Sequence, residues 1–450
     1  MEYSRGKLKA EGKTKKIWEA CKSEQLLAVI EDFVIIENKE DITAFDDPKF
    51  TKKFATKARC ATTTTCKVFG LLKASGIPVA YVEQISPTEF VALNCVMIPL
   101  EVVARRYAVG SYLKRHPELA KEGQPYRFHR LVTEFFLKTT KGSLKTADGE
   151  IVVEGLDPQK GEEDPFIINP LEEKWKLYHS KKPKWDSGSD LARTVDAGKI
   201  VPSVGAMFFN PMEAMKEMDN LMRETFLVLE GAWAILGLRL IDMKIEFGVD
   251  VNGNLVVADV IDNDSWRLRT SDWQELSKEA FRQGEELNEV ERKYGIVADL
   301  ANNFRIPSQV IVIWRGSDKD SSPAQNVKTD GLNFEEVVLS GHKSPGRCLE
   351  KLEEILARYP EGGVFIVKVG MSNGLGPIIA ARTSWPVIAI PASVKDFPDD
   401  VWSSLRMPSQ VPLQVVVSDD NAIKCAMNIL ASKNPAIYMQ RQKSIEEMDN

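Results

Sequence analysis

The chain has 450 residues, which is too long for one hydrophobic core and predicts several domains at about 100–200 residues per domain. Its composition is 43% hydrophobic and 28% charged, which argues against disordered and low-complexity proteins. The 59 basic and 65 acidic residues give a net charge of −6, and this balance argues against a general nucleic-acid-binding protein. We therefore expect a globular protein in which any basic pocket for phosphate groups is local.

The cysteines and the hydropathy pattern exclude further classes of protein. The six cysteines lack CxxC spacing and the chain has four histidines, so we expect neither a zinc site nor a disulfide framework. Residues 1–16 lack the apolar core of a secretory signal, and the apolar stretches are too short or too charged to span a membrane. These features predict a cytoplasmic protein that binds neither membranes nor nucleic acids.

The first part of the chain mixes strand and helix patterns. Residues 26–37 are apolar and rich in β-branched side chains and predict a strand, whereas 65–75 predict a helix that ends before Gly76. A second helix is predicted at 113–122 and a short strand at 135–138.

Residues 141–211 differ from their surroundings, because Gly, Pro, Asp and Lys dominate there. We expect this segment to be an irregular surface insertion. After it, the apolar spacing at 212–237 predicts a helix. Residues 239–249 and 255–260 predict two strands joined by a tight turn at Asn252-Gly253.

The charged segment 273–303 predicts helices that connect two halves of the chain. Beyond Pro307, apolar runs typical of buried parallel strands alternate with helical segments. These runs are 310–314, 337–340, 364–369, 386–390 and 412–417. The alternation predicts a doubly wound parallel sheet, followed by a polar tail at 440–450 that frays.

Three charged residues alternate along the predicted strand at 239–249. Asp242, Lys244 and Glu246 share one face of that strand, because side chains two residues apart point the same way. The paired strand ends at Asp259, with further carboxylates just beyond it. Carboxylates at strand ends suit a Mg²⁺–nucleotide site, and a lysine among them suits a phosphoryl group. The alternative interpretation is a solvated sheet face.

Two basic motifs lie earlier in the chain. The run EGKTK at 11–15 places lysines beside a glycine, as a polyphosphate site requires, but it lacks Walker A spacing and also fits a solvated turn. Arg105 and Arg106 precede a Gly-Ser turn at 110–111, and this pattern suits a clamp for phosphate or carboxylate. A basic helix face is the alternative there.

Polar loops follow the first three predicted parallel strands, at 316–317, 340–343 and 372–377. The carboxyl ends of strands in a doubly wound sheet are where such folds bind ligands. His342 is the only histidine of this half and is an acid–base candidate, with a purely structural histidine as the alternative. The glycine-rich loop at 372–377 can present backbone N–H groups to a phosphate.

Taken together, these motifs resemble one family, the animal bifunctional enzymes that fuse phosphoribosylaminoimidazole carboxylase to phosphoribosylaminoimidazole succinocarboxamide synthetase. The synthetase half is matched by EGKTK, MIPLEVVARRYAVGSYLKR, DMKIEFGVD and ADVIDNDSWRL. The carboxylase half is matched by GHKSP, GMSNGLGP, PVIAIPA and DVWSSLRMPS. Order and spacing hold over nearly the whole chain except 141–211, which is longer than the family usually has.

The resemblance implies an α/β and α+β protein. An ATP-grasp-like synthetase domain with antiparallel sheets would occupy 1–271, with 141–211 as a long excursion. A helical connector at 272–307, a doubly wound parallel three-layer α/β carboxylase domain at 308–435 and a tail at 436–450 would follow. The synthetase would join carboxyaminoimidazole ribonucleotide to L-aspartate with ATP and Mg²⁺. The carboxylase would add CO₂ or bicarbonate to aminoimidazole ribonucleotide without ATP, biotin or zinc, in a homo-octamer.

Site residues follow from the same resemblance. Those expected at ATP are Lys13, Lys15, Met97, Glu101 and Lys244. Glu246 and Asp259 would face Mg²⁺, with Lys244 and Asp264 as catalytic residues and Asp264 beside the attacking amine. Those expected at the synthetase ribonucleotide are Arg105, Ser111, Ser265 and Arg267. In the carboxylase half His342 would move the proton at the ring carbon. Those expected at its ribonucleotide are Ser317, Asp320, Ser340, Lys343, Ser372, Asn373 and Gly374.

The chain also departs from the family pattern, mostly in the ligand loops. The departures are Thr56, Arg269, Lys319, Gly341, Met371 and Gln410. Met371 replaces a basic residue, which weakens an anion contact. Two alternatives follow from these departures. One is a diverged paralogue that keeps one active half or joins a different carboxylate and amine, and the other is a non-catalytic subunit of an oligomeric assembly.

Overall fold

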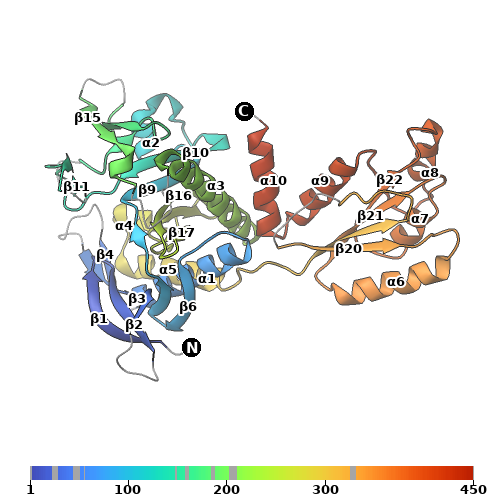
Figure 1. Ribbon diagram of the computed structural model, residues 1–450, viewed down its shortest axis with the longest axis horizontal. Coiled ribbons are helices and arrows are strands. Elements are labelled where there is room, and N and C mark those ends of the chain that lie inside the picture. Colours follow the sequence, from blue (N-terminus) through green and yellow to red (C-terminus); the bar gives the residue numbers. More distant parts are fainter. Residues whose placement is uncertain are drawn as a thin grey trace. The chain divides into compact units, whose positions relative to one another are not determined.

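The structure, a computed structural model, describes residues 3–22, 29–43, 51–54, 56–146, 149–157, 162–183, 188–201, 210–324 and 331–448. Its contacts group the chain into two compact units (Figure 1). The N-terminal unit comprises Met1–Lys73 and Ile77–Phe304, and the C-terminal unit comprises Ala74–Gly76 and Arg305–Asn450. The domain boundaries predicted at 271, 307 and 435 stay predictions.

An antiparallel sheet forms the start of the N-terminal unit, with strand order β1-β2-β3-β7-β6. Its strands are β1 (Tyr3–Glu11), β2 (Lys15–Lys22), β3 (Val29–Asn38), β6 (Tyr81–Ser86) and β7 (Glu89–Leu93). Strand β3 alternates its faces, because Val34 and Ile36 pack against Cys66 whereas Ile35 packs on the opposite side. The strand predicted at 26–37 is confirmed from residue 29 onward, and 26–28 lie outside the described residues.

Helix α1 (Lys57–Ala74) covers one face of this sheet through Cys66. The helix predicted at 65–75 is therefore confirmed, but it begins at Lys57. The run of threonines at 62–65 hid this start, because β-branched residues are weak helix formers. Their hydroxyls have buried partners: Thr62 accepts from Asn38 Nδ2 at 2.8 Å, and Thr65 donates to the Ile261 carbonyl at 3.2 Å.

A larger antiparallel sheet forms the centre of the N-terminal unit. Its order is β15-β14-β13-β10-β9-β16-β17, with β8 and β18 also paired to β16. The strands are β8 (Val96–Met97), β9 (Leu100–Tyr107), β10 (Arg127–Leu137), β13 (Phe166–Ile167), β14 (Lys174–Tyr178), β15 (Asp190–Asp196), β16 (Arg239–Val249), β17 (Leu255–Ala258) and β18 (Trp266–Arg269). The predicted strands at 239–249 and 255–260 are confirmed, and Gly253 N donates to the Asp250 carbonyl in the turn between them.

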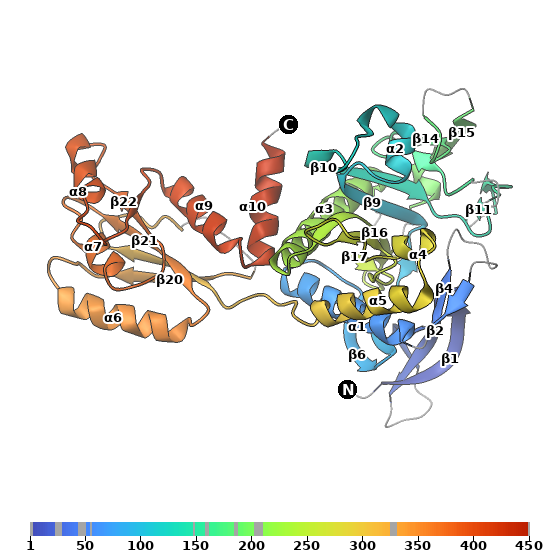
Figure 2. The same cartoon turned by 180° about the vertical axis from the view of Figure 1, so that it is seen from behind.

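Helix α3 (Pro211–Ile235) packs along β16, β9 and β10, as Figure 2 shows. It confirms the helix predicted at 212–237. Asn210 caps it by accepting from Met212 N at 3.0 Å, and Pro211 stands at the first helical position, where its missing N–H is harmless.

The prediction that residues 141–211 are irregular is wrong for their described part. They form β11 (Leu144–Lys145), β12 (Ile151–Val153), β13, β14, β15 and a 3₁₀ turn at Ala197–Lys199. Residues 147–148, 158–161, 184–187 and 202–209 lie outside the described residues. In β14, Trp175 and Leu177 are fully buried between exposed lysines, which is the alternation of a half-buried strand. Gly- and Pro-rich flanks obscured this short pattern.

The helix predicted at 113–122 is also corrected. The structure has a short α2 (Ser111–Arg115) and then a 3₁₀ turn at Pro117–Leu119. Pro117 lacks a backbone N–H and disfavours helical backbone at His116, whose φ and ψ are −132° and 62°. The strand predicted at 135–138 is the end of the longer β10.

The segment 273–303 contains α4 (Glu279–Arg282) and α5 (Leu287–Ala301). Both helices belong to the N-terminal unit, where α4, α5 and α1 share a buried cluster (Figure 2). Phe281 of α4 and Tyr294 of α5 pack there with Cys60 of α1 and with Ile42 of β4 (Asp41–Thr43), the strand that pairs with β5 (Thr51–Lys53). The helical character is confirmed, and the helices contribute to the core of this unit.

The C-terminal unit is a parallel sheet, as predicted, and its strand order is β20-β19-β21-β22-β23. The strands are β19 (Val310–Arg315), β20 (Asn333–Val338), β21 (Gly363–Val369), β22 (Val387–Pro391) and β23 (Gln414–Val415). Strand β20 begins before the predicted 337–340, and β23 is shorter than the predicted 412–417.

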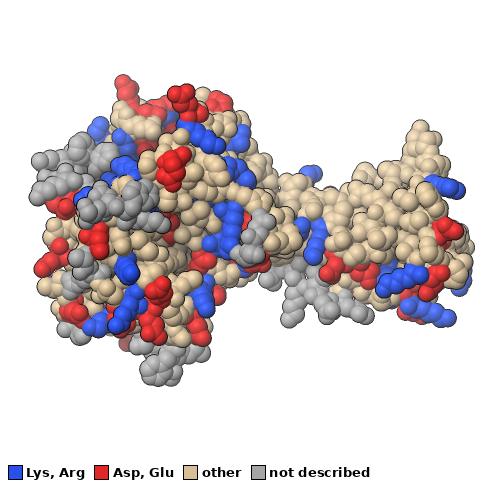
Figure 3. All heavy atoms as spheres, turned by 90° about the horizontal axis from the view of Figure 1, so that it is seen from above, with Lys and Arg blue, Asp and Glu red and all other residues tan. Residues whose placement is uncertain are grey.

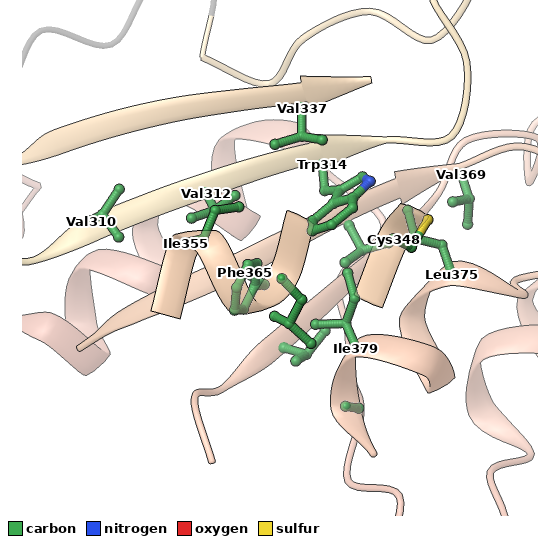
Figure 4. Close-up of a cluster of buried hydrophobic side chains, with 14 residues drawn as sticks. Val310, Val312, Trp314, Val337, Cys348, Ile355, Phe365, Val369, Leu375 and Ile379 are labelled. Atoms are coloured by element: carbon green, nitrogen blue, oxygen red, sulfur yellow. The ribbon is translucent and has the colours of Figure 1, made fainter. Parts of the chain in front are cut away.

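Helices cover both faces of this sheet and make it three-layered. They are α6 (Pro345–Arg358), α7 (Leu375–Ala380), α8 (Trp402–Leu405), α9 (Asp419–Leu430) and α10 (Pro435–Glu447), with a 3₁₀ turn at Pro398–Val401. On one face Trp314 and Phe365 pack with Ile355 of α6 and Ile379 of α7 (Figure 4). On the other face Ile313 and Ile366 pack with α9 and with Ile437 of α10.

The prediction of a fraying tail at 440–450 is wrong as far as residue 448. Helix α10 extends to Glu447, and residues 449–450 lie outside the described residues. Asn434 caps this helix by accepting from Ala436 N at 3.1 Å and Ile437 N at 3.2 Å. The fully buried Ile437 anchors it beside α9. None of the helices in the described ranges has both the length and the apolar character needed to cross a membrane.

The packing in Figure 4 predicts the effect of shortening a buried side chain of α6. Ile355→Ala should destabilise the C-terminal unit by about 2–5 kcal/mol, because it leaves a cavity between α6 and the sheet. Hydrogen exchange of β19 and β21 amides measures this change in this unit alone. Glu353→Ala, at an exposed position of the same helix, is the control and should stay within about 0.5 kcal/mol. Equal exchange in both variants would contradict the packing.

Candidate active sites

A row of alternating charges crosses one face of the central sheet. The pairing register places Asp242 of β16 opposite Arg105 of β9 on one side and Arg267 of β18 on the other. Glu134 of β10 lies beside Arg105 on the same face. The row, in spatial order, is Arg115, Glu134, Arg105, Asp242, Arg267 and Glu279. Because each member lies next to an opposite charge, the row can be buried.

Distances confirm that the charges in this row are directly paired. Arg105 Nε lies 2.6 Å from Glu134 Oε2, and Arg105 also bonds Asp242 through Nη1. Arg267 Nη1 lies 2.7 Å from Asp242 Oδ2. Arg105, Glu134 and Asp242 are each only 4% exposed, so solvent hardly screens these pairs. Asp242 in turn raises the pKa of Arg267.

Three residues expected at the synthetase ribonucleotide meet at this row. Arg105 Nη2 donates to Ser111 Oγ at 3.2 Å, and Arg267 lies against Gly110. A Cβ at Gly110 would come within 2.8 Å of Arg267 Nη2, and the φ of +57° there also favours glycine. A cavity of about 590 Å³ opens here, lined by Gly110, Arg267 and Trp273 among others. Ser265 faces elsewhere, because its hydroxyl bonds the backbone of Val260.

A second cluster groups residues expected at ATP and Mg²⁺. Lys244 Nζ lies 2.6 Å from Glu101 Oε1 and 3.4 Å from Glu246 Oε1. Lys138, which the sequence did not single out, also bonds Glu246. Lys15 pairs with Asp259, which follows β17. Lys15 also lies within electrostatic reach of Glu246, so both predicted metal-binding carboxylates act on this lysine.

Charge regulation in this cluster follows from burial and proximity. Burial alone would lower the pKa of Lys244, but Glu101 and Glu246 outweigh it and raise that pKa. Burial lowers the pKa of Lys15 to about 8, and two other lysines act in the same direction. Burial would raise the pKa of Glu246, but Lys244, Lys138 and Lys15 together lower it. Lys244 and Glu246 therefore stay ionised around neutral pH.

Two residues expected at ATP lie at the edge of this cluster. Lys13 lies in the turn between β1 and β2. Met97 is in the short strand β8, opposite Gly248 of β16, and is 41% exposed. An exposed methionine beside a charged cluster suits contact with a flat apolar ring.

A third cluster surrounds Asp264 and draws on residues far apart in the sequence. Lys57 of α1 lies 3.3 Å from Asp264 Oδ2 and 3.6 Å from Asp262 Oδ2. Lys278 lies 3.1 Å from Asp264 Oδ2, and the Tyr294 hydroxyl donates to Asp264 Oδ1. Burial opposes ionisation, yet Lys278, Lys57 and Tyr294 hold the pKa of Asp264 well below its usual range. Burial raises the pKa of Asp262.

Sequence reasoning missed Lys57, Lys278 and Tyr294. They come from α1, from the residue before α4 and from α5, so no local spacing joined them to Asp264. Lys57 alone left a trace in the sequence. It begins a helix whose other residues are mostly apolar or threonine, and a charged side chain is rarely buried in such a setting without a partner.

In the C-terminal unit the second and third polar loops touch each other. A Cβ at Gly374 would overlap the imidazole of His342, so the candidate histidine lies on the backbone of the glycine-rich loop. A Cβ at Gly341 would come within 2.7 Å of Leu375 Cα. The start of α7 therefore leaves no room for a side chain at Gly341, which is one of the departures from the family pattern.

The third loop is held by the segment around α8. Ser372, with φ +61°, donates its backbone N–H to Asp400 Oδ1 at 2.8 Å. Asn373 is buried, accepts from Gly376 N at 2.8 Å and donates to Ser404 Oγ at 3.0 Å. Of the residues expected at the ribonucleotide, Asn373 thus shapes the loop. Ser340 stabilises the second loop, since its hydroxyl accepts from Lys343 N at 3.3 Å.

Two basic side chains that the sequence did not single out bind the first loop. Arg315 donates to the Asp320 carbonyl at 2.7 Å. Lys368 is 7% exposed and bonds both Ser321 Oγ and Asp419 Oδ2 at 2.8 Å. Burial raises the pKa of the Asp320 carboxyl. A lysine inside the apolar run 364–369 was the signal for this contact.

Comparison with known families defines the class of the two units. A family model described as SAICAR synthetase matches residues 8–157 and 189–298, and one described as AIR carboxylase matches residues 309–450. The first model leaves 158–188 unmatched, a segment that contains β13 and β14. The fold and these matches define a synthetase fused to a carboxylase.

The chain belongs to the SAICAR synthetase family, with an AIR carboxylase domain fused behind it. It is 35% identical to the Caenorhabditis elegans protein named "Probable multifunctional protein ADE2", over 96% of this chain and 91% of that protein. It is 32% identical to the Homo sapiens bifunctional phosphoribosylaminoimidazole carboxylase/phosphoribosylaminoimidazole succinocarboxamide synthetase, over 98% of this chain and 93% of that protein. A solved succinocarboxamide synthase from Ehrlichia chaffeensis is 21% identical with a TM-score of 0.47, over 66% of this chain and 98% of that one.

The third cluster predicts a large loss of stability on removing its buried lysine. Lys57→Met should destabilise the N-terminal unit by about 3–5 kcal/mol, because Asp262 and Asp264 lose a buried partner. Hydrogen exchange of α1 measures the change. Lys53→Met removes a lysine that is 69% exposed and should have little effect. A similar, small change in both variants would contradict the buried pairing.

Proposed function

We propose that this chain catalyses two reactions of de novo purine biosynthesis. The C-terminal unit carboxylates aminoimidazole ribonucleotide, and the N-terminal unit joins the resulting carboxylate to L-aspartate at the expense of ATP. The observation that carries this proposal is the match of both family models, in order, to a chain whose bifunctional relatives are matched over nearly their full length. The alternating charges in the N-terminal unit and the paired loops in the C-terminal unit support it.

The lysine–carboxylate cluster is the proposed ATP site. Lys15 and Lys244 supply ammonium groups for the phosphates, and Lys13 lies in the adjoining turn. Met97 and Glu101 lie on two strands, β8 and β9, that both pair with β16, and they would contact the adenine. Forming an amide from a carboxylate requires loss of an oxygen, and phosphoryl transfer from ATP makes that oxygen a good leaving group. Lys244 would stabilise the transferring phosphoryl group.

The residues at this cluster fit a magnesium ion shared with ATP. Mg²⁺ is usually held by one or two carboxylates together with substrate phosphates, and Glu246 and Asp259 offer such carboxylates. Within the described ranges, no group of three or more His, Cys, Asp or Glu side chains could hold a metal ion by itself. We therefore assign Glu246 and Asp259 to Mg²⁺, which would neutralise phosphate charge when bound. Neither zinc nor biotin has a part in the proposed reactions.

The arginine row is the proposed ribonucleotide site of the synthetase. Arg105 and Arg267 present guanidinium groups beside Ser111, at the cavity of about 590 Å³. Guanidinium suits bidentate contact with phosphate and carboxylate. Ser265 would contribute by stabilising the turn that carries Asp264 and Arg267. Asp264 would face the amine of L-aspartate.

The three loops of the C-terminal unit form the proposed carboxylase site. His342 would move the proton at the ring carbon that receives CO₂, and Gly374 fixes the position of its imidazole. Backbone N–H groups and hydroxyls of the loops would bind the ribonucleotide. The assigned residues are Ser317, Asp320, Ser340, Lys343, Ser372, Asn373 and Gly374.

We also propose a cytoplasmic homo-octamer built on the carboxylase units. Phe397, Trp402 and Leu405 are about half exposed near α8, at 52%, 47% and 50%. Figure 3 shows a broad area of this unit without charged side chains. Large exposed apolar side chains of this kind mark association surfaces, and a second copy of the chain is the proposed occupant.

The division of labour predicts that each half can be inactivated separately. Lys244→Met should lower ADP formation with ATP, Mg²⁺, L-aspartate and carboxyaminoimidazole ribonucleotide by at least about a hundredfold, because a charge beside the phosphoryl group is lost. His342→Asn should abolish carboxylation of aminoimidazole ribonucleotide with bicarbonate. Each variant should keep the other activity, which serves as its folding control. A wild-type protein silent in one assay would show that this half is inactive or acts on another substrate.

The third carboxylase loop predicts a gain of binding on restoring a basic residue. Met371 is 64% exposed, so Met371→Arg should be tolerated. A new charge-assisted contact of about 1.5–3 kcal/mol should lower the KM for aminoimidazole ribonucleotide roughly tenfold or more. Met448→Arg, at a methionine 69% exposed outside the loops, is the matched control and should leave the KM unchanged. An unchanged KM in both variants would place the phosphate away from residue 371.

A further inference from the structure

Tyr294 has a buried hydroxyl with one well-defined partner. It lies on α5, is 1% exposed, and donates to Asp264 Oδ1. Its ring is fixed on several sides. Phe54 meets it edge-on with ring centroids 5.4 Å apart, and the Lys57 ammonium lies 5.3 Å from the ring centroid. Because the ring is fixed, the direction of the hydroxyl bond is fixed as well.

The two oxygens of Asp264 are held by different parts of the fold. Oδ2 receives Lys57 from α1 and Lys278 from the segment before α4, whereas Oδ1 receives Tyr294 from α5. The lysines supply charge compensation, and removing either one would leave a buried charge short of a partner. The tyrosine supplies no charge. Its hydroxyl is therefore available to fix the orientation of a carboxylate whose ionisation the lysines already favour.

This partner choice is unusual for a purely structural tyrosine. A buried tyrosine hydroxyl needs a single acceptor, which any backbone carbonyl can provide. Tyr294 instead bonds a candidate active-site carboxylate that two lysines already pair. It reaches that carboxylate from a helix that begins more than twenty residues after Asp264 in the sequence.

We propose that Tyr294 is a positioning residue of the ligase site, whose hydroxyl holds the Asp264 carboxylate in the one orientation that suits the attacking amine. The proposal rests on the ligase function proposed above and deepens it. Helix α5, which the sequence predicted as part of a connector, thus supplies part of that site. A carboxylate free to rotate about its Cβ–Cγ bond presents the correct oxygen to the amine for only part of the time, so loss of the hydroxyl acts on turnover.

The test is Tyr294→Phe in the full chain, assayed for ADP formation. The substitution keeps the ring and its packing and removes one oxygen atom. We expect kcat for ligation to fall about tenfold, with the KM for ATP, the carboxylase activity and the melting temperature unchanged. An unchanged kcat would overturn the proposal. A loss of ATP binding or of thermal stability in step with kcat would show a merely structural role and would overturn it too.

Two comparisons sharpen the test. Tyr81→Phe removes a hydroxyl from a half-buried tyrosine between Phe69 and Phe90, away from the three charge clusters, and should keep kcat within twofold. Asp264→Asn should lower kcat further than Tyr294→Phe, and adding Tyr294→Phe to it should change kcat less than twofold. Effects that multiply would show that Tyr294 does not act through Asp264. A wild-type chain without ligase activity would instead overturn the proposed function itself.

Discussion

The alternating row of charges across the central sheet is the constraint on which the N-terminal site depends. A buried charge without a partner costs several kcal/mol, so Glu134, Arg105, Asp242 and Arg267 each fix the next one along the row. Four strands must keep their register for these pairs to form, because a slip of one residue would turn each side chain to the other face. The fold thereby sets charged groups at fixed positions before a substrate arrives, and such preorganisation favours charge development in a transition state.

The two units hold their candidate sites by different means. In the N-terminal unit, ion pairs between strands carry the arrangement, and few of its positions tolerate a change of charge. In the C-terminal unit, backbone hydrogen bonds such as that of Ser372 and close contacts at glycines such as Gly374 hold the loops in place. Side chains at the rims of the C-terminal loops can therefore vary more freely. Lys319 and Met371 are exposed positions of this kind, whereas Gly341 is held by its contact with α7.

The sequence predicted those features that repeat within one element. The sequence predicted the alternating charges at Asp242, Lys244 and Glu246, and it predicted the apolar runs of the parallel sheet. Both patterns are local properties of a strand. The sequence did not predict side chains that meet from distant segments. Tyr294 and Lys57 reach Asp264 only because α5 and α1 pack together. Local composition gave a wrong prediction in two places. The threonines at 62–65 hid the start of α1, and the flanks rich in turn residues hid the strand alternation around Trp175.

The contact between Gly341 and Leu375 means that two loops of the C-terminal unit cannot change independently. A side chain at residue 341 would collide with the backbone at the start of α7, and that start is tied through Asn373 to the segment around α8. A side chain there would therefore require a shift of α7, and that shift would also move Gly374, which supports His342. The second and third loops are therefore coupled, and the effect of a substitution in one depends on the residues of the other.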